Sequence, residues 1–320
     1  MRRLHLLETL DPDIVSGSYT SPPQHLLNME ENIYTTSEVL SDEDLALITS
    51  VMDNDLAQAN AENAESTSET PVENIIPENS RTILLDEFTS RFNSAIWYDK
   101  IRTMQVLLAG VGGIGSYIGF LLSRLQVRHF TIYDPDTVEA VNISGQMYPI
   151  TSIGENKVEA LSKIIRDFSG FYNYSTRCER YTEENAAYPI MICGFDNMEA
   201  RRVFFNKWKS YVLSTSRPEE CLYIDGRLAA EEFQILSIQG TDRRAIQEYE
   251  EKWLFSDEEA EATICSYKQT TFMANMIASM MVNVFVNFAA NLSDPAPIIP
   301  RDIPFFISYS ADTMFTKVEM

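Results

Sequence analysis

The stretch LLAGVGGIGSYIGFLL (residues 107–122) limits the possible folds of this chain more than any other. The apolar run MQVLLAG leads into it, and a helical apolar pattern starts at Ile114. Glycines at G-x-G-x-x-G spacing let the backbone turn tightly and approach an anion, at which the N-terminus of the following helix is directed. We therefore expect a phosphate-binding loop between a buried strand and a helix, formed by Gly110, Gly112, Gly113, Gly115 and Ser116.

Strand-like and helix-like segments alternate after this loop. Apolar strand patterns cover 129–134, 174–178, 188–194 and 221–226, with helical patterns over 156–168 and from Met198. This alternation predicts an α/β fold, a doubly wound Rossmann-like sheet of mostly parallel strands with helices on both faces. We also expect a helix over 82–103, a looser pattern over 229–240, a helix near 243–253, a long helix from Lys268, and one or two edge strands over 303–318.

Residues 1–80 differ in composition from the rest of the chain. They contain sixteen acidic residues and two arginines, and so carry −14 of the total charge of −22. The segment 57–80 has few apolar side chains to bury, so we expect a largely disordered acidic tail over 1–80 and one domain over 81–320. Within the tail, residues 41–56 show a helical pattern that fits either a transient helix or a docking motif for a partner.

Several classes of protein are disfavoured by composition. No basic patch is present, which argues against nucleic-acid binding. The four cysteines form no C-x-x-C pair, so we expect reduced thiols in a cytoplasmic protein, not a zinc or dithiol site. The leucines near the start are too few for a signal peptide. The apolar run 271–292 contains four asparagines, so we expect a core or dimer-interface helix and no membrane span.

Further motifs narrow the ligand. Asp134 ends the second predicted strand, where a carboxylate can bind ribose hydroxyls of either NAD or ATP. The segments DPDTVEAVNISGQ (134–146), IGENKVEAL (153–161) and CGFDNMEARR (193–202) follow. In order and near-family spacing, these segments resemble the ThiF/MoeB/HesA family, which includes the ubiquitin-activating enzymes. The resemblance covers roughly residues 87–290.

The resemblance implies ATP-dependent adenylation of a carboxylate, often the C-terminal glycine of a ubiquitin-like protein. Asp134 would hold the ribose, Asn142 and Lys157 would reach the triphosphate, and Asp196 would hold Mg²⁺. Lys157 would neutralise charge on the leaving pyrophosphate. Two plainer interpretations remain open: Lys157 as a solvated helix lysine, and Asp196 as only the N-cap of the helix from Met198. The same motif adds Asp136 and Gln146 to the predicted site.

The chain departs from the family pattern at two arginine positions. Gly145 replaces the arginine of N-x-x-R-Q. In SRFNS, Arg91 matches the first arginine of R-[YF]-x-R-Q, but Ser94 replaces the second. One such contact is worth on the order of 3 kcal/mol in a transition state. Either Arg91, from this or a neighbouring subunit, or Arg201 substitutes, or the protein binds nucleotide without efficient turnover.

A candidate nucleophile precedes the long apolar helix. The segment CSYKQTTFMANMIASMM, which starts at Cys265, resembles ubiquitin-fold-modifier-activating enzymes, in which a catalytic cysteine is followed by a Thr-Thr pair. That resemblance implies that Cys265 accepts the acyl group as a thioester. A nearby helix N-terminus would lower the thiol pKa, whereas the neighbouring acidic residues would raise it. A buried, inert cysteine is the alternative.

These residues fit three functions to different degrees. The preferred one is an adenylyltransferase that uses ATP and Mg²⁺ to activate the C-terminus of a ubiquitin-like or sulfur-carrier protein. The alternative, favoured by Gly145 and Ser94, is a non-catalytic nucleotide-binding partner subunit. An NAD oxidoreductase is disfavoured because Asp136, Asn142 and Lys157 match the other motif. We expect a homodimer or pairing with a related subunit.

Overall fold

The computed structural model describes residues 87–170, 173–255 and 269–320, which all fall in one compact unit, Ile76–Met320. The predicted tail, its helical segment 41–56, the predicted domain boundary at residue 80, and Cys265 lie outside the described residues.

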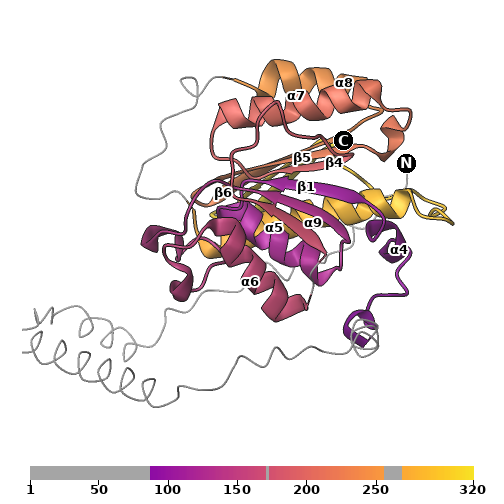
Figure 1. Ribbon diagram of the computed structural model, residues 1–320. Coiled ribbons are helices and arrows are strands. Elements are labelled where there is room, and N and C mark those ends of the chain that lie inside the picture. Colours follow the sequence, from indigo (N-terminus) through magenta and orange to yellow (C-terminus); the bar gives the residue numbers. More distant parts are fainter. Residues whose placement is uncertain (1–86, 171–172, 256–268) are drawn as a thin grey trace, which may run out of the picture. The chain divides into compact units, whose positions relative to one another are not determined.

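An eight-stranded mixed sheet forms the centre of the described part of the chain, in the order β3-β2-β1-β4-β5-β6-β7-β8 (Figure 1). Strands β1 to β5 pair in parallel, and β6, β7 and β8 pair antiparallel with their neighbours. The strands are β1 (Gln105–Ala109), β2 (His129–Tyr133), β3 (Tyr174–Arg177), β4 (Ile190–Cys193), β5 (Leu222–Ala229), β6 (Glu232–Gln239), β7 (Phe306–Ser310) and β8 (Phe315–Glu319).

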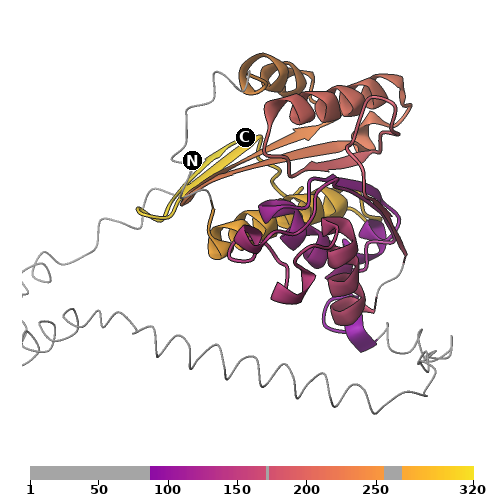
Figure 2. The same cartoon turned by 60° about the vertical axis from the view of Figure 1, so that its left-hand side comes forward.

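Helices cover both faces of the sheet, because central strands such as β1 and β4 are apolar on both sides and must be buried on both. In Figures 1 and 2, α5, α6 and α9 lie below the sheet and α7 and α8 lie above it. The predicted fold class is therefore confirmed. The helices are α4 (Tyr98–Ile101), α5 (Gly113–Arg124), α6 (Lys157–Ser169), α7 (Met198–Ser214), α8 (Arg243–Glu248) and α9 (Thr271–Asn291).

Two hydrophobic clusters hold the layers together. On one face, Ile118 of α5 and Phe285 of α9 are fully buried against the sheet. On the other, Phe205 of α7 packs on Tyr249, with ring centroids 4.6 Å apart. Helix α9 is long and apolar enough to cross a membrane, but 61% of its most apolar window is buried inside the fold. It is a core helix, as its asparagines predict.

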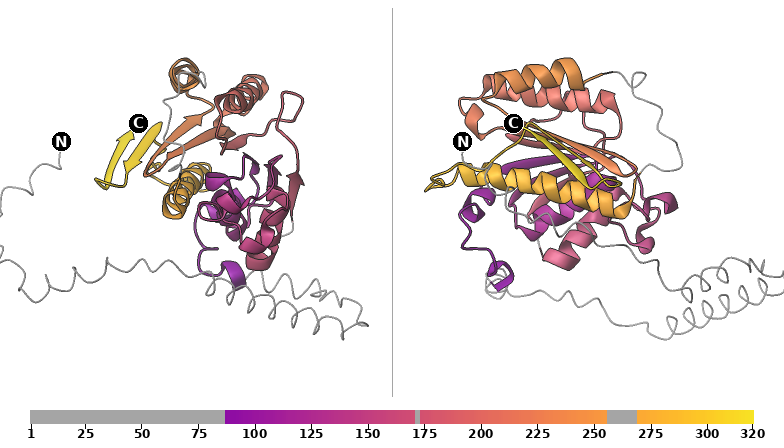
Figure 3. Two further views of the ribbon diagram at one scale, coloured as in Figure 1. Left: turned by 90° about the vertical axis from the view of Figure 1, so that its left-hand side faces the viewer. Right: turned by 180° about the vertical axis from the view of Figure 1, so that it is seen from behind.

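Two segments differ from the sequence prediction. Residues 82–103 do not form one helix: the described part makes turns over 90–97 before α4, where the Ser90 hydroxyl bonds the Glu87 carbonyl and competes with helical bonding. The looser pattern after Gly226 is regular strand, because β5 continues to Ala229 and turns directly into β6, with Ala230 at φ 48°. In Figure 3, β7 and β8 form the outer edge of the sheet, and all five β8 residues are exposed.

The strand order reverses between β1 and β4. The chain runs from β1 outward through β2 to β3, and then returns to start β4 on the other side of β1. Beyond the carboxyl ends of two such strands the loops diverge, which is where ligands bind in open α/β sheets. The glycine-rich loop follows β1 at this position.

Candidate nucleotide-binding site

Close backbone packing fixes the glycine-rich loop. Gly110 has φ +82°, and a Cβ there would lie 2.7 Å from the Gly194 carbonyl carbon at the end of β4. A Cβ on Gly115 would lie 1.9 Å from the Gly110 oxygen. The Tyr148 hydroxyl donates to the Val111 carbonyl at 2.6 Å. Gly110, Gly115 and Gly194 are therefore required by packing, and sequence reasoning had not included Gly194.

The N-terminus of α5 remains open to an anion. Gly112 occupies the N-cap position without a side-chain hydrogen bond, and no acidic residue lies in the first turn. The first backbone N–H groups of a helix have no intrahelical acceptor and carry partial positive charge. A Cβ on Gly112 would meet only Gln146 Nε2, at 3.8 Å, so packing does not require glycine there. Gly112 leaves room above the helix N-terminus.

Asp134 braces the loop from the end of β2. Its Oδ2 accepts the Val111 N–H at 2.7 Å, and its Oδ1 accepts the Asp136 N–H at 2.9 Å. Burial raises the pKa of the Asp134 carboxyl, and these two hydrogen bonds and Lys157 partly oppose that rise. Each carboxylate oxygen retains a second lone pair, so a ribose contact by Asp134 stays a prediction.

Lys157, the first residue of α6, points to the same edge. Its Nζ lies 3.0 Å from Asp136 Oδ2, with side-chain exposures of 10% and 63%, respectively. Lys157 is therefore not a solvated helix lysine. A buried ammonium that pairs with an exposed carboxylate can exchange that partner for a phosphate.

The segment that carries Asn142 and Gln146 is tied to α5. Ser116 Oγ accepts the Met147 N–H at 3.0 Å. Asn142 Oδ1 accepts the Glu139 N–H at 2.9 Å within its own turn, so a phosphate contact by Asn142 stays a prediction. Gln146 is 8% exposed, and its Oε1 has no hydrogen-bond partner among the described residues. A buried orphan acceptor beside an open helix N-terminus fits a polar ligand.

At the end of β4, Asp196 is not the N-cap of α7. Asn197 is the cap, since its side chain accepts the Ala200 N–H at 2.9 Å. Asp196 is exposed, and its Oδ1 accepts a hydrogen bond from the Asn197 amide. The N-cap interpretation is wrong, and the proposed role in Mg²⁺ binding stays a prediction. The described residues contain no cluster of three or more His, Cys, Asp or Glu side chains that could hold a metal alone.

The two candidate substitute arginines differ in position. Arg201 is 5% exposed and ion-paired with Asp225, and it also donates to the Phe195 and Gly226 carbonyls. These bonds commit Arg201 to the junction of β4, β5 and α7, so it cannot replace a phosphate-binding arginine without breaking them.

Arg91 follows, by three residues, a side chain that contacts the far end of α5. The Phe88 ring, three residues before it, contacts Arg124, whose guanidinium carbon is 4.5 Å from the ring centroid. Arg124 is the last residue of α5, twelve residues or about 18 Å from the glycine-rich loop. Arg91 is exposed, and a phosphate contact by Arg91, from this chain or from a neighbouring subunit, stays a prediction.

Sequence reasoning missed Gln269, which follows the undescribed residues 256–268. A Cβ on Gly113 would lie 2.0 Å from Gln269 Oε1, and a Cβ on Gly145 would lie 2.9 Å from its Nε2. The Gln269 carboxamide thus lies between these two glycines at the start of α5. Its position next to the Thr-Thr pair was the available signal.

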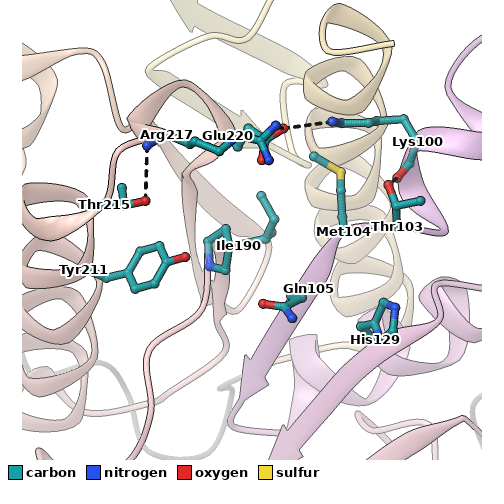
Figure 4. A pocket seen from close by; sticks show the side chains of 11 residues that line it. Lys100, Thr103, Met104, Gln105, His129, Ile190, Tyr211, Thr215, Arg217 and Glu220 are labelled. Carbon is teal, nitrogen blue, oxygen red and sulfur yellow. Dashed lines mark hydrogen bonds and ion pairs between the residues drawn. The ribbon is translucent and has the colours of Figure 1, made fainter. Parts of the chain in front are cut away.

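A separate cavity of about 410 Å³ opens at the amino ends of the strands, opposite the end that carries the glycine-rich loop. It is lined by starting residues of strands, such as Gln105 and His129, and in Figure 4 Glu220 lies between Arg217 and Lys100. The Lys100–Glu220 ion pair measures 3.1 Å. Glu220 pairs with both cations, and no glycine lines the cavity, so the glycine-rich loop at the carboxyl edge remains the candidate nucleotide site.

The arrangement at the carboxyl edge agrees with a family assignment. The model of the ThiF family matches residues 80–298. The chain belongs to the ThiF family. Ubiquitin-like modifier-activating enzyme 5 from Rattus norvegicus is 29% identical over 121 residues, which cover 32% of this chain and 30% of that protein. The Xenopus laevis enzyme of the same name is 35% identical over 72 residues, covering 22% and 18%. The chain thus matches less than a third of the length of these relatives.

Solved structures support the fold of this ThiF-family chain. The crystal structure of PaaA superposes with a TM-score of 0.54 at 13% identity, covering 93% of this chain and 90% of that one. Escherichia coli MccB with ATP superposes with a TM-score of 0.53 at 15% identity, covering 75% and 70%. At these identities the similarity establishes the shared architecture.

Proposed function

We propose that this ThiF-family protein binds ATP and transfers AMP to a carboxylate, the C-terminus of a ubiquitin-like or sulfur-carrier protein. The main support is that the glycine-lined N-terminus of α5, which has no side-chain cap, and the buried Lys157 both lie at the carboxyl ends of the strands. Family membership, the modifier-activating relatives and the structure of MccB with ATP support the same ligand.

In the proposed reaction, a carboxylate oxygen attacks the α-phosphorus of ATP. A C–O–P linkage forms as the bond to pyrophosphate breaks, giving an acyl-adenylate and pyrophosphate. The α5 N-terminus would bind phosphate oxygens, and Lys157 would exchange Asp136 for the negative charge that develops on the leaving pyrophosphate. Asp196 would hold Mg²⁺, which supplies further positive charge to the phosphates.

Thioester transfer is a second part of the proposal. The Cys265 thiolate would attack the acyl carbonyl of the adenylate and release AMP. Cys265 precedes Gln269 by four residues, which span at most roughly 14 Å of extended chain. Because the Gln269 side chain lies against the glycine-rich loop, the length of the intervening chain permits Cys265 to reach an adenylate there.

Pyrophosphate exchange with labelled ATP, over a panel of ubiquitin-like and sulfur-carrier proteins, tests adenylation. We expect exchange with one carrier and a thiol-sensitive adduct that disappears in Cys265→Ala while exchange persists. Cys178→Ala is the matched control. Cys178 is an exposed residue, and partial burial of its thiol together with the neighbouring Glu159 carboxylate raises the pKa of that thiol. An adduct that survives Cys265→Ala would make Cys265 structural.

The non-catalytic partner subunit remains the second candidate, because Gly145 supplies no charge and Arg201 is committed to Asp225. ATP binding without exchange for any carrier would favour it. A homodimer, or pairing with a related subunit that contributes its Arg91, and a cytoplasmic location complete the proposal.

A further inference from the structure

We infer that Gln269 takes over, at the phosphate-binding loop, the contact that family members make with an arginine at position 145. This inference rests on the proposed ATP binding. It treats Gly145 and Gln269 as a matched pair, so that the glycine is the space in which the glutamine side chain lies and not simply a lost arginine.

Steric contacts on both sides define the pair. The Gln269 carboxamide occupies the positions where side chains of residues 113 and 145 would begin. The φ angle of Gly145 is not positive, so backbone strain does not explain why residue 145 is a glycine. A Cβ at residue 145 would lie 2.9 Å from Nε2 and 3.0 Å from Cγ of Gln269, so the Gln269 side chain would have to move to admit it.

The flanking contacts hold Gln269 at this place. The Thr271 hydroxyl donates to the Ser144 carbonyl, which joins the start of α9 to the residue before Gly145. Gln269 also forms an isolated parallel bridge with Ala230 in the turn between β5 and β6. These contacts fix the backbone of Gln269 from two directions and direct its side chain to the loop.

The chemistry of the carboxamide suits a phosphate. Its Nε2 carries two N–H donors, and no hydrogen bond joins the group to another described residue. It lies beside the open N-terminus of α5, with the Gln146 carboxamide near Gly112 on the other side of the loop. A neutral donor binds a phosphate oxygen without the full charge of an arginine, so Gln269 is a positioning residue for the triphosphate.

Calorimetry with ATP and AMP on five proteins tests the inference: the parent, Gln269→Ala, Gly145→Arg, Gly145→Arg/Gln269→Ala, and the control Gln247→Ala on the exposed face of α8. Loss of one hydrogen bond to a charged group should weaken ATP binding about tenfold in Gln269→Ala. AMP binding should weaken by no more than ATP binding does, because AMP offers fewer phosphate oxygens to the Gln269 carboxamide. Gly145→Arg should weaken ATP binding in the parent but strengthen it in the Gln269→Ala background, where the space is vacant.

Thermal unfolding of Gly145→Ala gives a readout that needs no nucleotide. The new methyl group should lower Tm in the parent and leave it unchanged in Gln269→Ala, because the clash is with that side chain. If the parent binds no ATP, the proposed function fails. If the parent binds ATP but Gln269→Ala matches Gln247→Ala, or the two substitutions act additively, only the Gln269 inference is overturned.

Discussion

Lys157 illustrates how the surroundings of one side chain decide its chemistry. Its ammonium is buried at the start of α6 and is paired with the exposed Asp136. The ion pair keeps the charge at the edge where a triphosphate would bind, while the exposed partner remains replaceable.

We therefore expect Lys157→Ala to lower the rate of pyrophosphate exchange by roughly 100-fold, because one charge contact to the leaving group is lost. Adenosine binding should change little, since Lys157 would contact the phosphates only. The matched control is Lys163→Ala on the same helix, where the exposed lysine pairs with Glu155. Equal exchange rates in both variants would show that the site has been misplaced.

Residue roles were predictable where the partner is close in the chain, and not where it is distant. The glycines of the loop follow directly from the motif. Arg201 looked free in the sequence because Asp225, its partner, is 24 residues away and meets it only through the packing of α7 on β4 and β5. Gln269 meets Gly145 across 124 positions, and nothing local marks that contact.

At the scale of elements, the glycines at the β1–α5 loop and at the end of β4 have different roles: some are needed for packing and others leave room for a ligand. Gly194→Ala would place a Cβ 2.5 Å from the Gly110 oxygen, a backbone atom that cannot move aside cheaply. We expect a loss of about 1–3 kcal/mol in unfolding free energy from that overpacking.

Gly112→Ala should behave in the opposite way. Its Cβ would meet nothing closer than 3.8 Å, so we expect unfolding within about 0.5 kcal/mol of the parent. ATP binding should nevertheless weaken several-fold, because the methyl group occupies the approach to the α5 N-terminus. Denaturant unfolding and calorimetry on both variants check the pair. Unchanged ATP binding in Gly112→Ala would contradict this division. So would a loss of stability in Gly112→Ala without one in Gly194→Ala.

Elements with strong patterns were predictable, and the exceptions have local causes. The runs that became β1 and β4 are apolar on both faces and alternate with helices, which required a parallel sheet. The segment 82–103 has helical spacing, yet Ser90 and the aromatic contact of Phe92 with Trp97 favour turns. The edge strands expected over 303–318 are confirmed as β7 and β8, although β8 is exposed throughout.

At the scale of the whole chain, the negative charge is concentrated in residues 1–80. Within the described residues, which start at Glu87, lie the sheet, both hydrophobic clusters and the glycine-rich loop, and the ThiF match begins at residue 80. The acidic segment 1–80 precedes all of them. Its composition predicts little contribution to a core, since burying a segment of charge −14 would require matching cations.

Deletion of residues 1–80 tests this division of the chain. We expect the shortened protein to unfold within about 2 °C of the parent, because no large apolar surface should be lost, and to bind ATP equally well. A second variant, with Leu45, Ile48 and Leu56 changed to Ser in the full chain, isolates the helical pattern of 41–56. Should both variants lose many degrees of Tm, that segment packs on the domain. Should both retain Tm and ATP binding while carrier-dependent exchange falls, the segment docks a partner.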